Sequence, residues 1–305
     1  MDFTYFCKEK DKTMILIADS GSTKTDWALI CNEKDNGSIK TQQFQTQGIN
    51  PIYMSEEEIV KILKDELLPQ LSSNSFSFSS NLLIHFYGAG CREDMIPKIK
   101  SAFVYVFSLS DSAISVQSDL MGAARALCGR EEGVACILGT GSNSCLYDGE
   151  RIVKNVSPMG FILGDEGSGA VLGKLFVNLL YKDQLPEIIR KEFEEKTGYS
   201  LTYIINKVYR EPLPNRFLAS LVPFIYDHLD VPEIKQMVID NFRSFFVRNV
   251  QHYHAQHLKV NAVGSVAFYF KECLCQAAEL EGYKIGIVMK NPLDSLVKYH
   301  QFDGK

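Results

Sequence analysis

The sequence predicts an α/β protein built from two domains. Segments rich in aliphatic and β-branched residues alternate with segments of helical periodicity, which is typical of a sheet covered by helices. Two short turns rich in Gly, Ser and Thr, each set between apolar runs, recur about 120 residues apart, at residues 20–25 and 139–142. A chain of 305 residues is also long for a single hydrophobic core.

The first domain is expected to begin with a β-hairpin. Residues 1–13 are polar and irregular, so the pattern starts at Met14. Ser55 and Glu58 form a capping box that opens an amphipathic helix, which we expect to pack on the sheet. Strands are predicted at residues 15–18, 27–30, 40–45, 82–87 and 113–117, and helices at 55–71 and 95–107.

The second domain is expected to restart the same order at Ser118. A helix at 120–128 and a strand at 134–138 precede two short strands that end near Val153. A long helical region at 172–257 follows, and then a strand at 260–263, a helix at 268–281 and a strand at 284–289. The predicted domains are therefore residues 14–117, joined by a C-terminal helix at 291–305, and residues 118–290.

Composition and charge favour a small-molecule enzyme of the cytoplasm. The chain is 46% hydrophobic and 23% charged, with a net charge of −5, so it has no excess of cations for nucleic acid or an anionic membrane. No window has the roughly 18 uncharged apolar residues of a membrane span. The eight cysteines lie mostly in apolar runs, without a CxxC pair, which favours reduced thiols in the core.

The two Gly-rich turns are suited to binding phosphate. A strand that turns tightly and re-enters a strand directs several backbone N–H groups and hydroxyls to one point. Lys24 and Thr25 invite comparison with a P-loop, but the glycines that a P-loop needs are replaced by Thr23 and Ala18. Either turn alone could be an ordinary hairpin. Both together, with Gly264 and Ser265 after a third apolar run, indicate a nucleotide-using enzyme.

The same motifs resemble a known family. The segments Asp19–Thr25, Asp119–Ala126, Leu138–Asn143, Gly160–Ser168 and Val263–Phe268 are similar in order and composition to the N-acetylglucosamine kinase group of the BadF/BadG-type ATPases, which share the actin, hsp70 and sugar-kinase fold. The segment Gly-Asp-Glu-Gly-Ser at residues 164–168 is the most distinctive. The resemblance implies two ribonuclease-H-like domains, with ATP and a sugar in the central cleft between them.

The resemblance also implies a role for individual residues. Asp119 would be the general base that accepts the proton of the sugar hydroxyl, and Asp19 would hold Mg²⁺ through a bound water molecule. The sugar would be bound by Asn50, Asn143 and Asp165. The phosphates and the adenosine of ATP would be bound by Gly21, Ser22, Thr23, Lys24, Thr25, Gly139, Thr140, Gly141, Ser142, Gly264 and Ser265.

Simpler interpretations exist for three of these residues. Asp119 directly precedes a helix and could be only its N-cap. Asp165 could be an acidic residue ahead of the helix that begins near Ala170. Asn50, between Gly48 and Pro51, is an ordinary turn residue by propensity.

The expected function is ATP-dependent phosphorylation of N-acetylglucosamine or glucosamine at the 6-hydroxyl. Two alternatives remain open: a BadF-type ATPase that activates a dehydratase through an iron–sulfur cluster, and a sugar-binding regulator without turnover. The helical region 172–257 has apolar stripes that could form a homodimer interface, although such stripes more often belong to a core.

Overall fold

A computed structural model describes residues 14–21, 23–32, 39–72 and 82–301. The chain divides into two compact units, Met1–Ala126 with Pro292–Lys305, and Leu127–Asn291. The boundary between the units, at Ala126, falls inside a helix, and Asp119 therefore belongs to the first unit. The boundary expected from the sequence, before Ser118, would place Asp119 in the second domain. No helix in the described ranges has the length and apolarity required to cross a bilayer.

The first unit contains a five-stranded sheet in the order β3-β2-β1-β4-β5. The first three strands are antiparallel, and β4 and β5 run parallel to β1. Ser20, Gly88 and Ser118, the last residues of the three parallel strands, are in register, so their carboxyl ends meet at one edge of the sheet. The strands are β1 (Met14–Ser20), β2 (Lys24–Asn32), β3 (Ile39–Gln47), β4 (Leu82–Gly88) and β5 (Ile114–Ser118).

The second unit repeats this strand order. Its sheet runs β8-β7-β6-β9-β10, again with an antiparallel meander of three strands and two further parallel strands. The two Gly-rich turns therefore join equivalent strands of two equivalent sheets, and the predicted fold class is confirmed. The strands are β6 (Gly133–Leu138), β7 (Ser142–Tyr147), β8 (Ile152–Asn155), β9 (Lys259–Val263) and β10 (Lys284–Met289).

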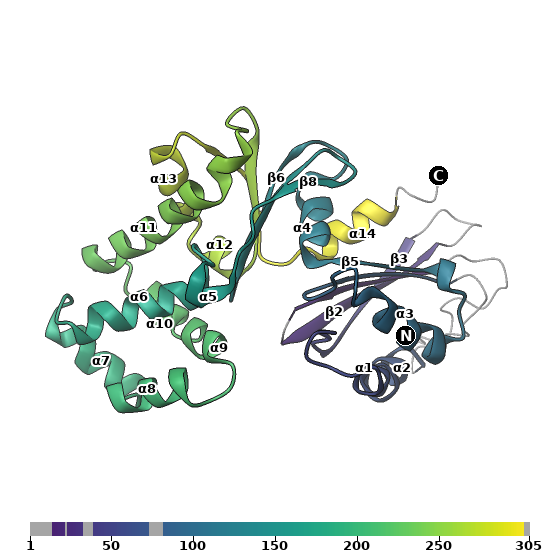
Figure 1. Ribbon diagram of the computed structural model, residues 1–305, viewed down its shortest axis with the longest axis horizontal. Coiled ribbons are helices and arrows are strands. Elements are labelled where there is room, and N and C mark those ends of the chain that lie inside the picture. Colours follow the sequence, from purple (N-terminus) through teal and green to yellow (C-terminus); the bar gives the residue numbers. More distant parts are fainter. Residues whose placement is uncertain (1–13, 22, 33–38, 73–81, 302–305) are drawn as a thin grey trace. The chain divides into compact units, whose positions relative to one another are not determined.

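Helices cover both faces of the first sheet (Figure 1). On one face lie α1 (Glu56–Ile62), the π-helical turn η1 (Leu63–Leu67), α2 (Leu68–Ser72) and α3 (Ile96–Phe107); on the other lie α4 (Asp119–Cys128) and α14 (Leu293–Gln301). The capping box of Ser55 and Glu58 is formed as predicted. Trp27 is fully buried, and its ring contacts Phe86 and Phe103 in the core between the sheet and the first group of helices.

The second unit carries the long helical region that the sequence predicts. Its core is aromatic, with Phe176, Phe193 and Phe242 fully buried. The predicted helix at 268–281 is two helices that meet at Phe270. The helices are α5 (Gly160–Leu163), α6 (Gly169–Tyr181), α7 (Glu187–Thr197), α8 (Leu201–Tyr209), α9 (Pro214–Ala219), α10 (Val222–Asp227), α11 (Pro232–Arg248), α12 (Ser265–Tyr269) and α13 (Lys271–Leu280), with a 3₁₀ turn η3 (Val250–Tyr253) after α11.

Candidate active site

The first Gly-rich turn closes the hairpin between β1 and β2. The N–H of Gly21 donates to the carbonyl of Lys24 at 3.0 Å, and Gly21, Thr23 and Lys24 are exposed at the tip. The ammonium of Lys24 lies 2.7 Å from the carboxylate of Asp26. These exposed groups are accessible to a ligand, as expected of a phosphate-binding turn. Ser22, also predicted here, lies outside the described residues.

Thr25 differs from the expectation for this turn. Its side chain is fully buried, and its Oγ1 lies 2.7 Å from Oγ of Ser20. Side chains alternate between the two faces of a strand, so Thr25 faces the interior while its neighbours Lys24 and Asp26 face outward. The hydroxyl of Thr25 is therefore used inside the fold, and only the backbone of Thr25 is left for the predicted contact with nucleotide.

Two carboxylates, Asp19 and Asp119, lie at the edge where the parallel strands end. Asp19 is the next-to-last residue of β1, and Asp119 follows β5 directly. Burial, and then the negative charges of Asp119 and Asp26, raise the pKa of Asp19 to about 7, against a smaller opposing effect of Lys24. The charge of Asp119 therefore acts on Asp19 in a poorly solvated position.

The first turn of α4 orients Asp119. Oγ of Ser118 accepts a hydrogen bond from the N–H of Met121 at 3.2 Å, so Ser118 provides the side-chain cap of this helix. The N–H groups of Leu120, at 2.8 Å, and of Asp119 itself hydrogen-bond the Asp119 carboxylate. Burial still raises the pKa of Asp119 above its ordinary value. The N-cap of α4 is thus Ser118, and the simpler interpretation of Asp119 as only an N-cap does not hold.

Asn50 belongs to the same edge of the first unit. Its Oδ1 accepts the N–H of Ile52 at 3.0 Å, which leaves the amide N–H groups as the donors for a ligand. Gly90, in the turn after β4, has a φ of +80°, and a Cβ placed there would lie 2.4 Å from Oδ1 of Asn50. Only glycine permits this approach. The turn Gly88–Gly90 is a part of the site that the sequence analysis did not include.

The second Gly-rich turn lies between β6 and β7 of the second unit. The N–H of Gly139 donates to the carbonyl of Gly141 at 3.0 Å, and the carbonyl of Gly139 accepts from Gly169 at 2.8 Å. Gly264, with a φ of +124°, is so close that a Cβ there would lie 2.3 Å from the carbonyl oxygen of Leu138. The turn and the residues after β9 are therefore one compact structure, with Gly264 and Ser265 beside the turn.

A cavity of about 370 Å³ opens beside this turn. Three residues predicted to bind nucleotide, Gly139, Thr140 and Ser265, line one side. The rest of the lining is mainly apolar and aromatic, which suits a purine ring, with Asp227 as a polar group. These residues come chiefly from α9, α10 and α12: Ala219, Ser220, Val222, Pro223, Tyr226, Asp227, Val266, Tyr269 and Phe270.

Asp165 lies against the second turn. A Cβ on Gly141 would be 3.1 Å from Oδ2 of Asp165, and the N–H groups of Ser142 and Gly160 hydrogen-bond its carboxylate. Burial is the largest cause that raises the pKa of Asp165 to about 6, and the two N–H groups oppose it. Asp165 also has a φ of +55°, which is uncommon for a residue with a side chain and occurs often at functional sites.

Asn143 is held by its neighbours on β7 and β8. Its Oδ1 accepts from the N–H of Ser144 and from Nδ2 of Asn155, each at 2.9 Å. The amide N–H groups of Asn143 are then its ligand-facing donors. Asn143, Asp165 and the turn Gly139–Ser142 therefore form one group in the second unit, while Asp19, Asp119 and Asn50 form another in the first.

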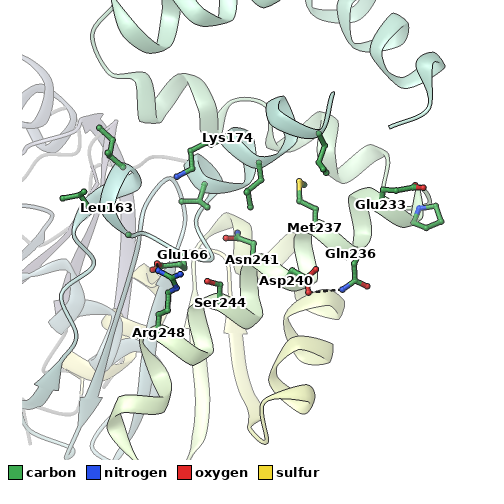
Figure 2. A pocket seen from close by; sticks show the side chains of 16 residues that line it. Leu163, Glu166, Lys174, Glu233, Gln236, Met237, Asp240, Asn241, Ser244 and Arg248 are labelled. Atoms are coloured by element: carbon green, nitrogen blue, oxygen red, sulfur yellow. Dashed lines mark hydrogen bonds and ion pairs between the residues drawn. The ribbon is translucent and has the colours of Figure 1, made fainter. Parts of the chain in front are cut away.

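Helix α11 supports the loop that carries Asp165. The N–H of Gly167 donates to Oδ1 of Asn241 at 3.1 Å, and Glu166 accepts from Arg248 and Asn249 at 3.4 Å. These contacts lie at one end of a cavity of about 900 Å³ between α6 and α11, where Figure 2 shows Glu166 and Arg248 pointing toward one another. The contacts fix the loop from the side of α11.

A metal ion at the first unit would need ligands from the substrate. Within the described residues, no group of three or more His, Cys, Asp or Glu side chains is arranged to hold a metal ion. Mg²⁺ commonly binds one or two carboxylates together with phosphate oxygens and water. Asp19 and Asp119 fit this requirement, since two poorly solvated carboxylates at one edge of the sheet attract a hard cation.

Solved structures resemble this chain over nearly its whole length, whereas no family model and no curated protein matches it. A provisionally named N-acetylglucosamine kinase from Porphyromonas gingivalis is 46% identical, covers 95% of this chain and 100% of its own, and superposes with a TM-score of 0.88. A protein of the same provisional name from Chromobacterium violaceum is 15% identical, with 94% and 98% covered and a TM-score of 0.75. A ROK hexokinase from Thermus thermophilus is 13% identical, with 91% and 93% covered and a TM-score of 0.51.

The repeated sheets and these comparisons define the class: the chain has the actin-like ATPase fold that sugar kinases share. The two more distant structures support the fold alone. The identity of 46% over almost the full length of both chains supports more, and this protein belongs to the N-acetylglucosamine kinase-like family.

Proposed function

We propose that this protein transfers the terminal phosphoryl group of ATP to the 6-hydroxyl of an amino sugar, N-acetylglucosamine or glucosamine. The observation that carries the proposal is the pair Asp19 and Asp119, two carboxylates with raised pKa values at the same strand-end edge of the first sheet. The choice of sugar follows the name of the relative with 46% identity.

Asp119 is the general base in this proposal. A carboxylate of raised pKa accepts a proton more readily than an exposed one, and the N–H groups of the α4 first turn keep it oriented. The sugar oxygen attacks the γ-phosphorus as its proton passes to Asp119, the bond from phosphorus to the β-phosphate oxygen breaks, and ADP leaves. Asp119 needs only modest basicity, because charge neutralisation and in-line placement dominate phosphoryl transfer.

Asp19 would hold Mg²⁺, which when bound with ATP neutralises phosphate charge in the transition state. The exposed ammonium of Lys24 in the first turn, and the backbone N–H groups of Thr140 and Gly141 in the second turn, would bind the phosphates. The cavity beside Gly139 would take the adenosine, with its apolar walls around the base and Asp227 near the ribose.

Sugar selection is assigned to Asp165, Asn143 and Asn50. At neutral pH a carboxyl with a pKa of about 6 is mostly ionised, so Asp165 acts as an acceptor for sugar hydroxyls. The two asparagines present amide donors. Half-buried polar groups of this kind discriminate against a sugar that lacks the matching hydroxyl, because they would be left without a partner.

The test is a coupled ADP-release assay over a panel of hexosamines and hexoses, with the product identified by ³¹P NMR. The proposal expects turnover with N-acetylglucosamine or glucosamine and a phosphate on the 6-oxygen. Sugar binding by calorimetry without any ADP release would instead support a regulator.

A further inference from the structure

Two buried hydroxyls, those of Ser20 and Thr25, link the first Gly-rich turn to the segment that carries Asn50. Both side chains are fully buried, and their oxygens are 2.7 Å apart. Oγ of Ser20 donates to the carbonyl of Ile49 at 2.9 Å and accepts the N–H of Ile49 at 3.0 Å. Both the donor and the acceptor of one backbone residue are therefore bound to a single side chain.

Thr25 strengthens the same connection. Its Oγ1 donates to the carbonyl of Gln47 at 3.2 Å and lies 3.3 Å from the N–H of Ile49, which it shares with Ser20. The N–H of Gly48 donates to the carbonyl of Thr23 at 3.1 Å. The segment 47–49 is thus tied to the hairpin at each of its three residues.

Other contacts fix the far side of Asn50. The turn after β4, which packs Gly90 against Asn50, is bound to the same serine, since the N–H of Ala89 donates to the carbonyl of Ser20 at 2.9 Å. Nζ of Lys98 donates to the carbonyls of Pro51, at 2.7 Å, and Met54, at 3.1 Å. Ser20 therefore binds both Ile49, on one side of Asn50, and the turn after β4, on the other side. Ser20 directly follows Asp19 in the sequence.

We propose that Ser20 and Thr25 are a positioning pair that sets the distance and orientation between Asn50 and the Asp19 end of β1. The inference rests on the proposed function, in which Asn50 binds the sugar and Asp19 serves the metal and phosphates. Neither hydroxyl touches a substrate. Their effect is to keep the acceptor sugar aligned with the phosphoryl group, and buried hydrogen bonds suit this role because water does not compete for them.

Three variants test the pair. Ser20→Ala and Thr25→Val remove one hydroxyl each with little change in volume, whereas Thr25→Ser keeps the hydroxyl. The first two should lower kcat/KM for the sugar by about 10- to 100-fold, the scale expected of a misplaced reactant. The KM for the sugar should rise by a larger factor than the KM for ATP. The kcat/KM of Thr25→Ser for the sugar should stay within about threefold of wild type.

Thr46→Val is the matched control. The Thr46 hydroxyl is buried on β3, next to these residues, and accepts from Nε1 of Trp27 at 2.9 Å and donates to the carbonyl of Gln47 at 3.0 Å, but it makes no contact with residues 48–50 in the described structure. Its loss should lower the melting temperature as much as the loss of Thr25 does, while kcat/KM for the sugar stays near wild type.

Equal kinetic losses in Thr46→Val and Thr25→Val, or wild-type sugar kinetics in Thr25→Val, would overturn the inference while the proposed function stands. If Ser20→Ala does not fold, the comparison of Thr25→Val with Thr25→Ser decides the question. A wild-type protein that turns over with no sugar of the panel would overturn the proposed function, and this inference with it.

Discussion

Asp19 and Asp119 are brought together by strand order, since β4 alone separates the strands that they end and follow. Burial is the largest cause that raises the pKa of Asp19 to about 7, and the charge of Asp119 is the next. Ionising both buried carboxyls without a cation costs stability, and sites of this kind are often functional.

Asp19→Asn should stabilise the metal-free protein at high pH. The pKa of Asp19 is raised from 3.8 to about 7 in the folded state. The contribution of Asp19 to the free energy of unfolding is therefore most favourable below pH 4, and it is lost as the pH rises through 7. The variant should gain on the order of 2 kcal/mol in the free energy of unfolding at pH 8, and less at pH 5. Urea unfolding in EDTA measures both; Asp94→Asn, at an exposed ion pair, is the control. An equal gain at both pH values would contradict the assignment.

Gly264→Ala should destabilise the second unit strongly. The backbone has a φ of +124°, and the added Cβ would lie 2.3 Å from the carbonyl oxygen of Leu138, so the turn must shift. We expect a loss of at least about 2 kcal/mol in thermal unfolding. Gly282→Ala is the matched control, because Gly282 also has a positive φ, +78°, but has open space around it, and it should cost only about 1 kcal/mol. Equal losses would show that the close approach has no role.

Asp165→Asn should raise the KM for the sugar by about 100-fold, because the amide nitrogen replaces an acceptor oxygen in a site built around N–H donors. Glu195→Gln, at an exposed position of α7, should change this KM by less than about twofold. In wild type, kcat/KM for the sugar should fall below pH 6 as Asp165 gains a proton. Steady-state kinetics from pH 5 to 8 measure both effects, and a pH-independent profile would argue against Asp165 as the acceptor.

Ala219→Trp should block the nucleotide cavity. Ala219 lines the cavity of about 370 Å³, and an indole in that position would occupy much of it. The Kd for ATP should rise by at least about 30-fold in calorimetry, with the melting temperature nearly unchanged. Leu201→Trp, at an exposed position of α8 outside the cavity lining, should leave ATP affinity unaltered. Unchanged ATP binding in Ala219→Trp would place the nucleotide elsewhere.

Local patterns were sufficient to predict most of the fold. The capping box at Ser55, the hairpin after Asp19 and the strand at 284–289 each depend on neighbours in the sequence, and each is present. The two Gly-rich turns were the one indication in the sequence that the two sheets have the same strand order. The pairings of β1 with β4 and of β6 with β9 could not be predicted, because they join residues far apart in the chain.

The site was predictable where motifs are contiguous and not where tertiary packing decides. Gly139–Ser142, Gly264 and Asp165 lie close together in the structure, and their roles in binding stay predictions. Tyr226 and Asp227 carry no local signal, because α10 reaches the cavity only through the packing of the helical region. The inward-facing Thr25 could have been recognised from strand alternation. The turn after β4 could have been recognised from the equivalence of β4 and β9, since Gly264 directly follows β9.

The role of Asp119 as the base that removes the proton of a sugar hydroxyl is decided by sugar-stimulated ADP release in Asp119→Asn. With Mg²⁺, ATP and the preferred hexosamine, kcat should fall by at least about 1,000-fold, while the Kd for ATP, measured separately by calorimetry, stays within about threefold of wild type. Release of ADP at the wild-type rate by this variant would show that Asp119 is not the base.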